Sequence, residues 1–83
     1  MHVILQDIFR RRVREELSDQ ELSQSELARR MGVTPSTVNQ YLSGKIAPGI
    51  DMVEQFALAL GFENPLDLLN ERKQQRKKLQ PAS

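Results

Sequence analysis

The chain has 83 residues and a formal net charge of +1, with 39% hydrophobic residues, 28% charged residues and no cysteine. A chain of this length forms one small domain without room for a separate catalytic domain, and its composition is that of a folded protein. The absence of cysteine excludes disulfide scaffolds, thiol catalysis and cysteine-based zinc fingers. The apolar runs are far shorter than the roughly 20 residues of a transmembrane helix, and no signal peptide is recognisable, so we expect a cytoplasmic protein.

The charged residues are distributed unevenly along the chain. Residues 1–70 carry seven basic and ten acidic side chains, whereas residues 71–83 carry five basic and one acidic. Leu79 is the only large apolar residue of the second stretch, which therefore cannot form a core of its own. We expect a folded domain at residues 1–70 and a flexible basic tail at residues 71–83, which either follows a phosphate backbone or only solubilises the chain.

An apolar stripe opens the folded part. Its residues recur every four positions, at Leu5, Phe9, Val13 and Leu17. This spacing predicts an amphipathic helix over about residues 4–18.

The charged residues of this first helix have two interpretations. Its arginines are expected to be solvated or ion-paired, although they could also contact phosphates: Arg10, Arg11, Arg12 and Arg14. The adjacent Glu15 and Glu16 point to different faces of the helix, which favours solvation over a paired catalytic acid and base.

A second helix is predicted to begin after Ser23. In the capping box Ser23-Gln24-Ser25-Glu26, the serine hydroxyl can accept a hydrogen bond from the Glu26 amide. Gly32 follows Met31 and suits the left-handed conformation in which many helices end. The second helix is therefore short.

Thr34-Pro35 then starts a third helix, with an N-cap hydroxyl and a proline at the first helical position. We expect this helix to span about residues 35–43 and to end at Ser43-Gly44.

Two further helices are predicted in the rest of the domain. Apolar residues with a period of 3.6 begin at Ile50 and stop at Gly61, which predicts the fourth helix. Asn64-Pro65 starts the fifth, with Leu66 and Leu69 expected to face inward. Nowhere do apolar and polar residues alternate as in a strand, so the sequence predicts an all-α fold of five helices.

The segment from Gln24 to Lys45 has the form of a helix-turn-helix: two short helices joined by a three-residue turn that contains glycine. In DNA-binding versions of this motif the second helix enters the major groove. Its apolar side chains share the core side, which leaves a polar face made of Ser36, Thr37, Asn39 and Gln40.

These residues resemble the lambda-repressor-like, or Xre/Cro-type, helix-turn-helix proteins of phages, plasmids and bacterial chromosomes. The resemblance extends from Leu5 to Leu69. Its pattern is read here at Leu22-Ser23-Gln24, Leu27-Ala28, Gly32, Val38, Gly44-Lys45 and Pro48. The sequence departs from the pattern in a longer link between the first two helices, and in Pro35, whose side chain cannot hydrogen-bond a base.

The resemblance implies a DNA-binding surface. Residues implied to read base edges, to which their side chains can hydrogen-bond, are Ser36, Thr37, Asn39 and Gln40. Residues implied to contact the DNA backbone are Gln24, Thr34, Ser43 and Lys45, together with exposed amides around Gly44. For each residue the alternative is an ordinary solvated polar side chain, and for Thr34 it is a helix cap.

The sequence therefore predicts a sequence-specific DNA-binding transcriptional regulator, most simply a repressor. It is expected to bind a pseudo-palindromic operator in double-stranded DNA as a homodimer, with Leu68 and the helix after Asn64 as the first candidate for the dimer interface. No enzyme, cofactor or metal is expected, because His2 is the only histidine and no nucleophile motif is present. The alternative is an antitoxin-type module that neutralises a partner protein, such as a toxin, and autoregulates its operon.

Overall fold

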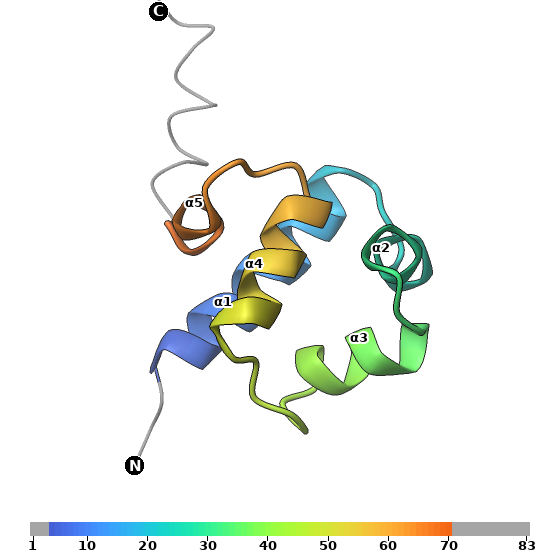
Figure 1. Cartoon of the computed structure of the whole chain (residues 1–83), viewed down its shortest axis with the longest axis horizontal. Coiled ribbons are helices and arrows are strands. Elements are labelled where there is room, and N and C mark those ends of the chain that lie inside the picture. The colour runs from blue at the N-terminus through green and yellow to red at the C-terminus, as the bar shows by residue number, and fades with distance from the viewer. Residues whose placement is uncertain (1–3, 71–83) are drawn as a thin grey trace, which may run out of the picture.

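The computed structural model describes residues 4–70, which form five α-helices and no strand (Figure 1). The predicted all-α fold is confirmed, and the helices are α1 (Ile4–Asp19), α2 (Gln24–Met31), α3 (Pro35–Leu42), α4 (Ile50–Ala59) and α5 (Pro65–Leu69). The predictions for His2 and for the basic tail at residues 71–83 concern residues outside the described part of the chain. None of the described helices is long and apolar enough to cross a membrane.

The predicted helix starts are confirmed in their hydrogen bonds. The Ser23 hydroxyl accepts from the Glu26 amide at 3.0 Å, and the Thr34 hydroxyl accepts from the Thr37 amide at 3.2 Å. The Asn64 side chain caps α5 in the same way, because its Oδ1 accepts from the Leu66 amide at 3.0 Å. Each cap satisfies one of the backbone donors that a helix start leaves without a partner inside the helix.

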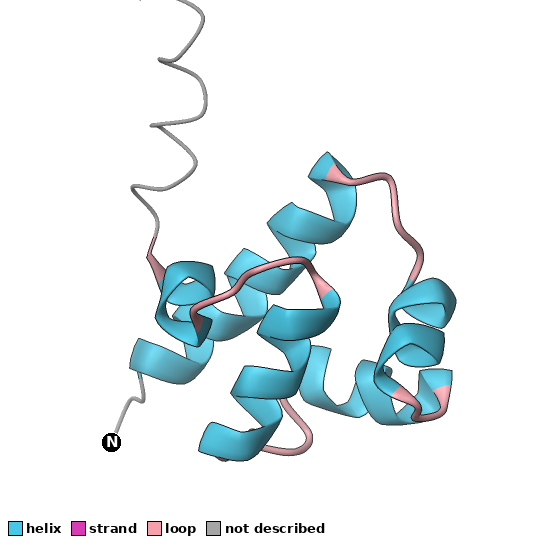
Figure 2. Cartoon of the chain, turned by 45° about the horizontal axis from the view of Figure 1, so that its top comes forward, coloured by secondary structure: helices cyan, strands magenta, loops and turns pink. Residues whose placement is uncertain are grey.

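Helices α2 and α3 lie on one side of α1 and α4, and α5 lies on the other (Figures 1 and 2). Helix α2 packs against α3 and α4, and α5 packs against α1 and α4. The molecule therefore has two distinct sides built on the same pair of central helices.

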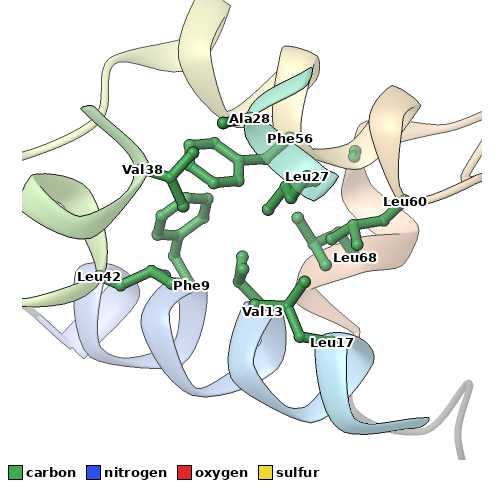
Figure 3. Packing of buried hydrophobic residues seen from close by; sticks show 11 residues of the cluster. Phe9, Val13, Leu17, Leu27, Ala28, Val38, Leu42, Phe56, Leu60 and Leu68 are labelled. Carbon is green, nitrogen blue, oxygen red and sulfur yellow. The ribbon is translucent and has the colours of Figure 1, made fainter. Parts of the chain in front are cut away.

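The core is a cluster of buried apolar side chains from all five helices (Figure 3). Leu60, the residue directly after α4, belongs to the same cluster. Phe56 of α4 meets the ring of Phe9 edge to face at a centroid distance of 5.0 Å, and that of Tyr41 at 5.8 Å. It thereby joins α1 and α3 to α4. Edge-to-face pairs add about 0.5–1.5 kcal/mol to the stability that their apolar burial provides.

The orientation of α5 differs from the prediction. Leu68, predicted as an exposed interface residue, is fully buried at 0% exposure, while Leu66, predicted to face inward, is 68% exposed. The two residues are two positions apart on a helix and therefore point to nearly opposite sides. The helix packs with Leu68 against the core, so the predicted interface at Leu68 is wrong.

Two of the apolar stripes also extend beyond the core. Leu5 at the start of α1 is 59% exposed, and Ile50 at the start of α4 is 85% exposed. Their helical period predicted burial, but both stripes run past the end of the core, where no other helix within residues 4–70 covers them.

A buried ion pair in α1 agrees with the expected ion pairing of Arg12 and corrects the expected solvation of Glu16. Arg12 is fully buried, and Glu16 is almost fully buried. An Arg12 Nη donates to Glu16 Oε2 at 3.1 Å, and the other donates to Glu15 Oε1 at 3.0 Å. The side-chain amide of Gln20 donates to Glu16 Oε1 and to the Leu60 carbonyl. It thereby links the ion pair to the end of α4.

Candidate nucleic-acid interface

Helices α2 and α3 are joined by a turn that holds them against one core. Gly32 adopts a left-handed conformation with φ of 77°, and the Val33 amide donates to the Ala28 carbonyl at 3.0 Å. This is a Schellman end, in which the residue after the glycine also makes an apolar contact, and Val33 packs against the core. The two helices bury Leu27, Ala28 and Val38 between them and the rest of the molecule.

The buried side of α3 determines which residues it presents outward. Val38 and Leu42 are buried, and the Tyr41 ring packs on Phe56. Because side chains on a helix follow one another by 100°, the opposite side carries the predicted base-reading residues. Of these, Ser36 and Asn39 are exposed, and Thr37 and Gln40 are half-buried.

Two of the predicted hydroxyls are already engaged with each other. The Thr34 and Thr37 Oγ1 atoms lie 3.0 Å apart, and Thr34 Oγ1 also accepts from the Thr37 amide. The helix-cap interpretation of Thr34 is therefore confirmed. A contact of Thr34 with DNA would use whatever hydrogen-bonding capacity its hydroxyl keeps beyond the cap.

The end of α3 corrects one part of the prediction. The amides expected to be exposed around Gly44 instead donate within the chain: Gly44 to the Tyr41 carbonyl at 3.3 Å, and Lys45 to the Gln40 carbonyl at 3.0 Å. These bonds close the helix C-terminus, which otherwise leaves carbonyl groups without partners. Ser43 and Lys45 are exposed residues here, and the Ser43 hydroxyl donates to the Gln40 carbonyl at 3.3 Å.

Arg14, expected from the sequence as a solvated, ion-paired or phosphate-contacting side chain, lies at this end of α3. Its guanidinium donates to the Leu42 carbonyl, the last of α3, at 2.7 Å. A cation at a helix C-terminus is stabilised by the partial negative charge there. The bond joins residues 28 positions apart, so no local sequence pattern indicated it.

Arg10 also lies near the C-terminal end of α3, beside Gly44. Its guanidinium lies 3.6 Å from the position that a β-carbon at Gly44 would occupy, and it is ion-paired with Asp7. Gly44 has φ of 87°, a conformation that favours glycine, whereas the distance to Arg10 is an ordinary van der Waals contact that a β-carbon would allow. Arg10, Arg14 and Lys45 together place three cations around the end of α3.

The charge around α3 is distinctive. From Val33 through Ile50 the sequence has no acidic residue, and Lys45 is its only charged side chain. On α2, by contrast, Glu26 is ion-paired with Arg29 and lies 3.9 Å from Arg30. The outward face of α3 is therefore neutral and rich in hydrogen-bonding groups, with positive charge at its C-terminal end.

The remaining predicted residue, Gln24, is the first residue of α2 and is half-buried directly after the Ser23 cap. At that position a side chain lies beside the positive end of the helix, which favours an anion such as a phosphate. No cluster of histidine, cysteine and acidic side chains that could hold a metal ion occurs within residues 4–70.

Comparisons with known proteins agree with this geometry. A family model described as helix-turn-helix matches residues 11–68. An uncharacterized HTH-type transcriptional regulator of Archaeoglobus fulgidus is 45% identical over 38 residues, which make up 46% of this chain. The match spans 17% of the length of that relative. No solved structure matches the chain.

Proposed function

The chain belongs to the helix-turn-helix family, and on that premise we propose that it is a DNA-binding transcriptional regulator. The family match agrees with the resemblance to lambda-repressor-like proteins found in the sequence. The name of the Archaeoglobus relative supports a role in transcription. The finer parts of the proposal are that the protein is a repressor that acts by occupying its operator, in the cytoplasm of a bacterial or phage-infected cell.

The observation that carries the proposal is the outward face of α3. Its opposite side is anchored in the core by Val38 and Leu42, so the face has one orientation relative to α2. It combines amide and hydroxyl side chains with an absence of acidic residues from Val33 through Ile50. A phosphate backbone repels acidic side chains, while base edges are recognised by groups of this kind.

The proposed roles divide the face into two sets. In the first, Gln40 and Asn39 pair with adenine edges, while Ser36 and Thr37 contact neighbouring bases. In the second, residues hold the DNA backbone on both sides of the reading helix: Gln24, Thr34, Ser43 and Lys45. We add Arg10 and Arg14 to the second set, because they bring positive charge to the end of α3 where Lys45 lies.

A homodimer is the form in which we propose that the chain reads DNA. One helix-turn-helix contacts too few base pairs for a specific site, whereas two copies related by a two-fold axis read two half-sites about 34 Å apart. The operator is then a pseudo-palindrome.

Selection of bound duplexes from a random pool tests this proposal. The expected result is enrichment of a two-fold symmetric sequence with half-sites spaced by one helical turn. A variant with Ser36, Thr37 and Gln40 replaced by alanine serves as the control and should enrich no such sequence. If the wild-type chain also enriches nothing above the starting pool, while circular dichroism shows it folded, the proposed DNA binding is wrong.

The antitoxin alternative requires a second experiment. An antitoxin that autoregulates its operon also enriches a specific sequence, so DNA selection alone does not separate the two. Co-expression with the protein encoded beside it separates them. A stable complex that relieves growth inhibition by that neighbour favours the antitoxin.

A further inference from the structure

The hydroxyl groups of Thr34 and Thr37 form a pair at the start of α3. Their Oγ1 atoms lie 3.0 Å apart, and Thr34 Oγ1 also accepts from the Thr37 amide at 3.2 Å. Within residues 4–70 the Thr37 hydroxyl has no other hydrogen-bond partner. Thr34 is exposed and Thr37 is half-buried, so both side chains reach solvent. We call these two groups the Thr34–Thr37 pair.

The hydrogen bond inside this pair can run in either direction. A hydroxyl has one proton to donate and two lone pairs that accept, and it rotates to suit its neighbours. Either Thr34 donates to Thr37 or Thr37 donates to Thr34, at the same distance between the Oγ1 atoms. The hydroxyl that donates within the pair has no proton left for a group outside it. The two residues therefore cannot both donate to DNA.

A phosphate beside Thr34 selects one of the two directions. Phosphate oxygens only accept hydrogen bonds, so a Thr34 hydroxyl that contacts the DNA backbone must donate to it. The bond inside the pair then has to come from Thr37. Thr34 Oγ1 accepts from both the amide and the hydroxyl of Thr37, which occupies its two lone pairs. The reverse direction would turn a lone pair of Thr34 toward an anion.

We propose that Thr34, through this bond, makes Thr37 an acceptor-only reader of the base that it meets. An acceptor matches the exocyclic amino groups of the major groove, which are adenine N6 and cytosine N4. It does not match guanine O6 and N7 or thymine O4, which are acceptors themselves. Thr37 therefore selects adenine or cytosine at one position of each half-site. Thr34 touches no base and is a positioning residue for this choice.

This role of Thr34 deepens the proposed function and rests on it, because the direction of the bond depends on a phosphate beside Thr34. A lone threonine hydroxyl distinguishes the four bases poorly, since it can donate to one base and accept from another. The Thr34–Thr37 pair removes that freedom. Specificity at this position thus comes from a contact with the DNA backbone, relayed by one hydrogen bond.

Binding titrations on the operator enriched by the wild-type chain test this role. The position that Thr37 reads is the one at which Thr37→Val loses its base preference. This variant keeps the shape of the side chain and the Thr34 cap on the amide of residue 37. The wild-type chain should bind about tenfold more tightly with adenine or cytosine there than with guanine or thymine. In Thr34→Ala the Thr37 hydroxyl regains its proton, and this ratio should fall to about twofold or less.

Two further variants separate this effect from the loss of the helix cap. Thr34→Ser restores a hydroxyl and should restore the base preference. Asn64→Ala is the matched control, because it removes the corresponding cap of α5, a helix outside the helix-turn-helix, and leaves the Thr34–Thr37 pair intact. Its base preference should equal that of the wild type. Circular dichroism checks that every variant is folded under the conditions of the titration.

A change in the DNA gives a second, independent measurement. The amino group is removed from the contacted base by placing purine instead of adenine, or 2-pyrimidinone instead of cytosine. This duplex should weaken wild-type binding about as much as Thr37→Val weakens binding to the unmodified duplex. Combining the two changes should add little further loss, because each removes one end of the same hydrogen bond.

The outcomes against this role are distinct from a failure of the proposed function. A ratio as large in Thr34→Ala as in the wild type would overturn the role of Thr34. Additive losses in the combined test, or a Thr37→Val variant that changes no base preference, would remove the bond between Thr37 and the base. A preference for thymine that is lost in Thr37→Ala but kept in Thr37→Val would assign Thr37 a methyl contact instead.

In all of these cases the wild-type chain still enriches an operator, so the proposed function stands. A folded wild-type chain that enriches no sequence would overturn the proposed function, and the role of Thr34 with it. A ratio that collapses in Thr34→Ala, returns in Thr34→Ser and persists in Asn64→Ala supports the role.

Discussion

The two sides of the central helices differ in what they expose. On one side, α3 shows side-chain groups such as the amide of Asn39 and the hydroxyl of Ser36. On the other side, Ile50 and Leu66 are exposed at an apolar groove between α1, α4 and α5. Both sides rest on the same buried cluster. Directional hydrogen-bonding groups suit the reading of base edges, whereas non-directional apolar contact suits association with another protein. The comparison shows that hydrogen-bonding and apolar side chains are exposed on separate surfaces of one small core.

The largest expected effect comes from removing the support that both sides share. Arg12→Ala leaves Glu16 buried without its cationic partner, which should lower the free energy of unfolding by about 3–5 kcal/mol. Urea denaturation measures this loss, and DNA binding and dimerisation should fall together. The double variant Arg12→Met/Glu16→Leu is the control, since an apolar pair of similar volume restores much of the stability. A single-variant loss well under 1 kcal/mol would show that the pair contributes nothing.

A substitution on α3 should affect one side only. Gln40→Ala is expected to reduce affinity for the selected operator by about 1–3 kcal/mol and to relax specificity at one base position, with the dimer unchanged. Binding titrations on the operator and on its single-base variants measure this. Gln55→Ala, which removes an exposed glutamine of α4, is the matched control. An equal loss on specific and random DNA would contradict the reading role.

A cap substitution separates stability from recognition within the same helix. Thr34→Ala removes the acceptor for the Thr37 amide and should lower the free energy of unfolding by about 0.5–2 kcal/mol. Thr34→Ser retains the hydroxyl and should stay close to the wild type. Thermal unfolding followed by circular dichroism is sufficient for the measurement. If alanine and serine are equally stable, the cap has no energetic role.

The smallest effect is expected at the edge of the reading face. Lys45→Ala should weaken binding to all DNA sequences alike and reduce the slope of log affinity against log salt by about 1. Affinity measured over a salt series tests this, with Lys45→Arg as a variant that keeps the charge. A loss confined to the operator would instead make Lys45 a base-reading residue.

Much of the fold was predictable because its signals are local. The starts of α2, α3 and α5 depend on a cap and its hydrogen bond within three residues, at Ser23, Thr34 and Asn64. The turn at Gly32 is equally local. The polar residues of α3 were predictable as a set because Val38 and Leu42 mark its buried side. Their individual contacts with DNA remain predictions.

The remaining features depend on which elements meet in space. The helical period allowed either Leu66 or Leu68 to face inward, and the packing of α5 on α1 and α4 selected Leu68. Contact between distant segments likewise placed Arg14 against the Leu42 carbonyl. It also placed the Gln20 side chain between Glu16 and the Leu60 carbonyl, to both of which it donates. The sequence by itself determined where helices begin and end, because capping acts over a few residues. The tertiary structure alone decided which side of each helix is covered, because burial depends on neighbours that are far away in the chain.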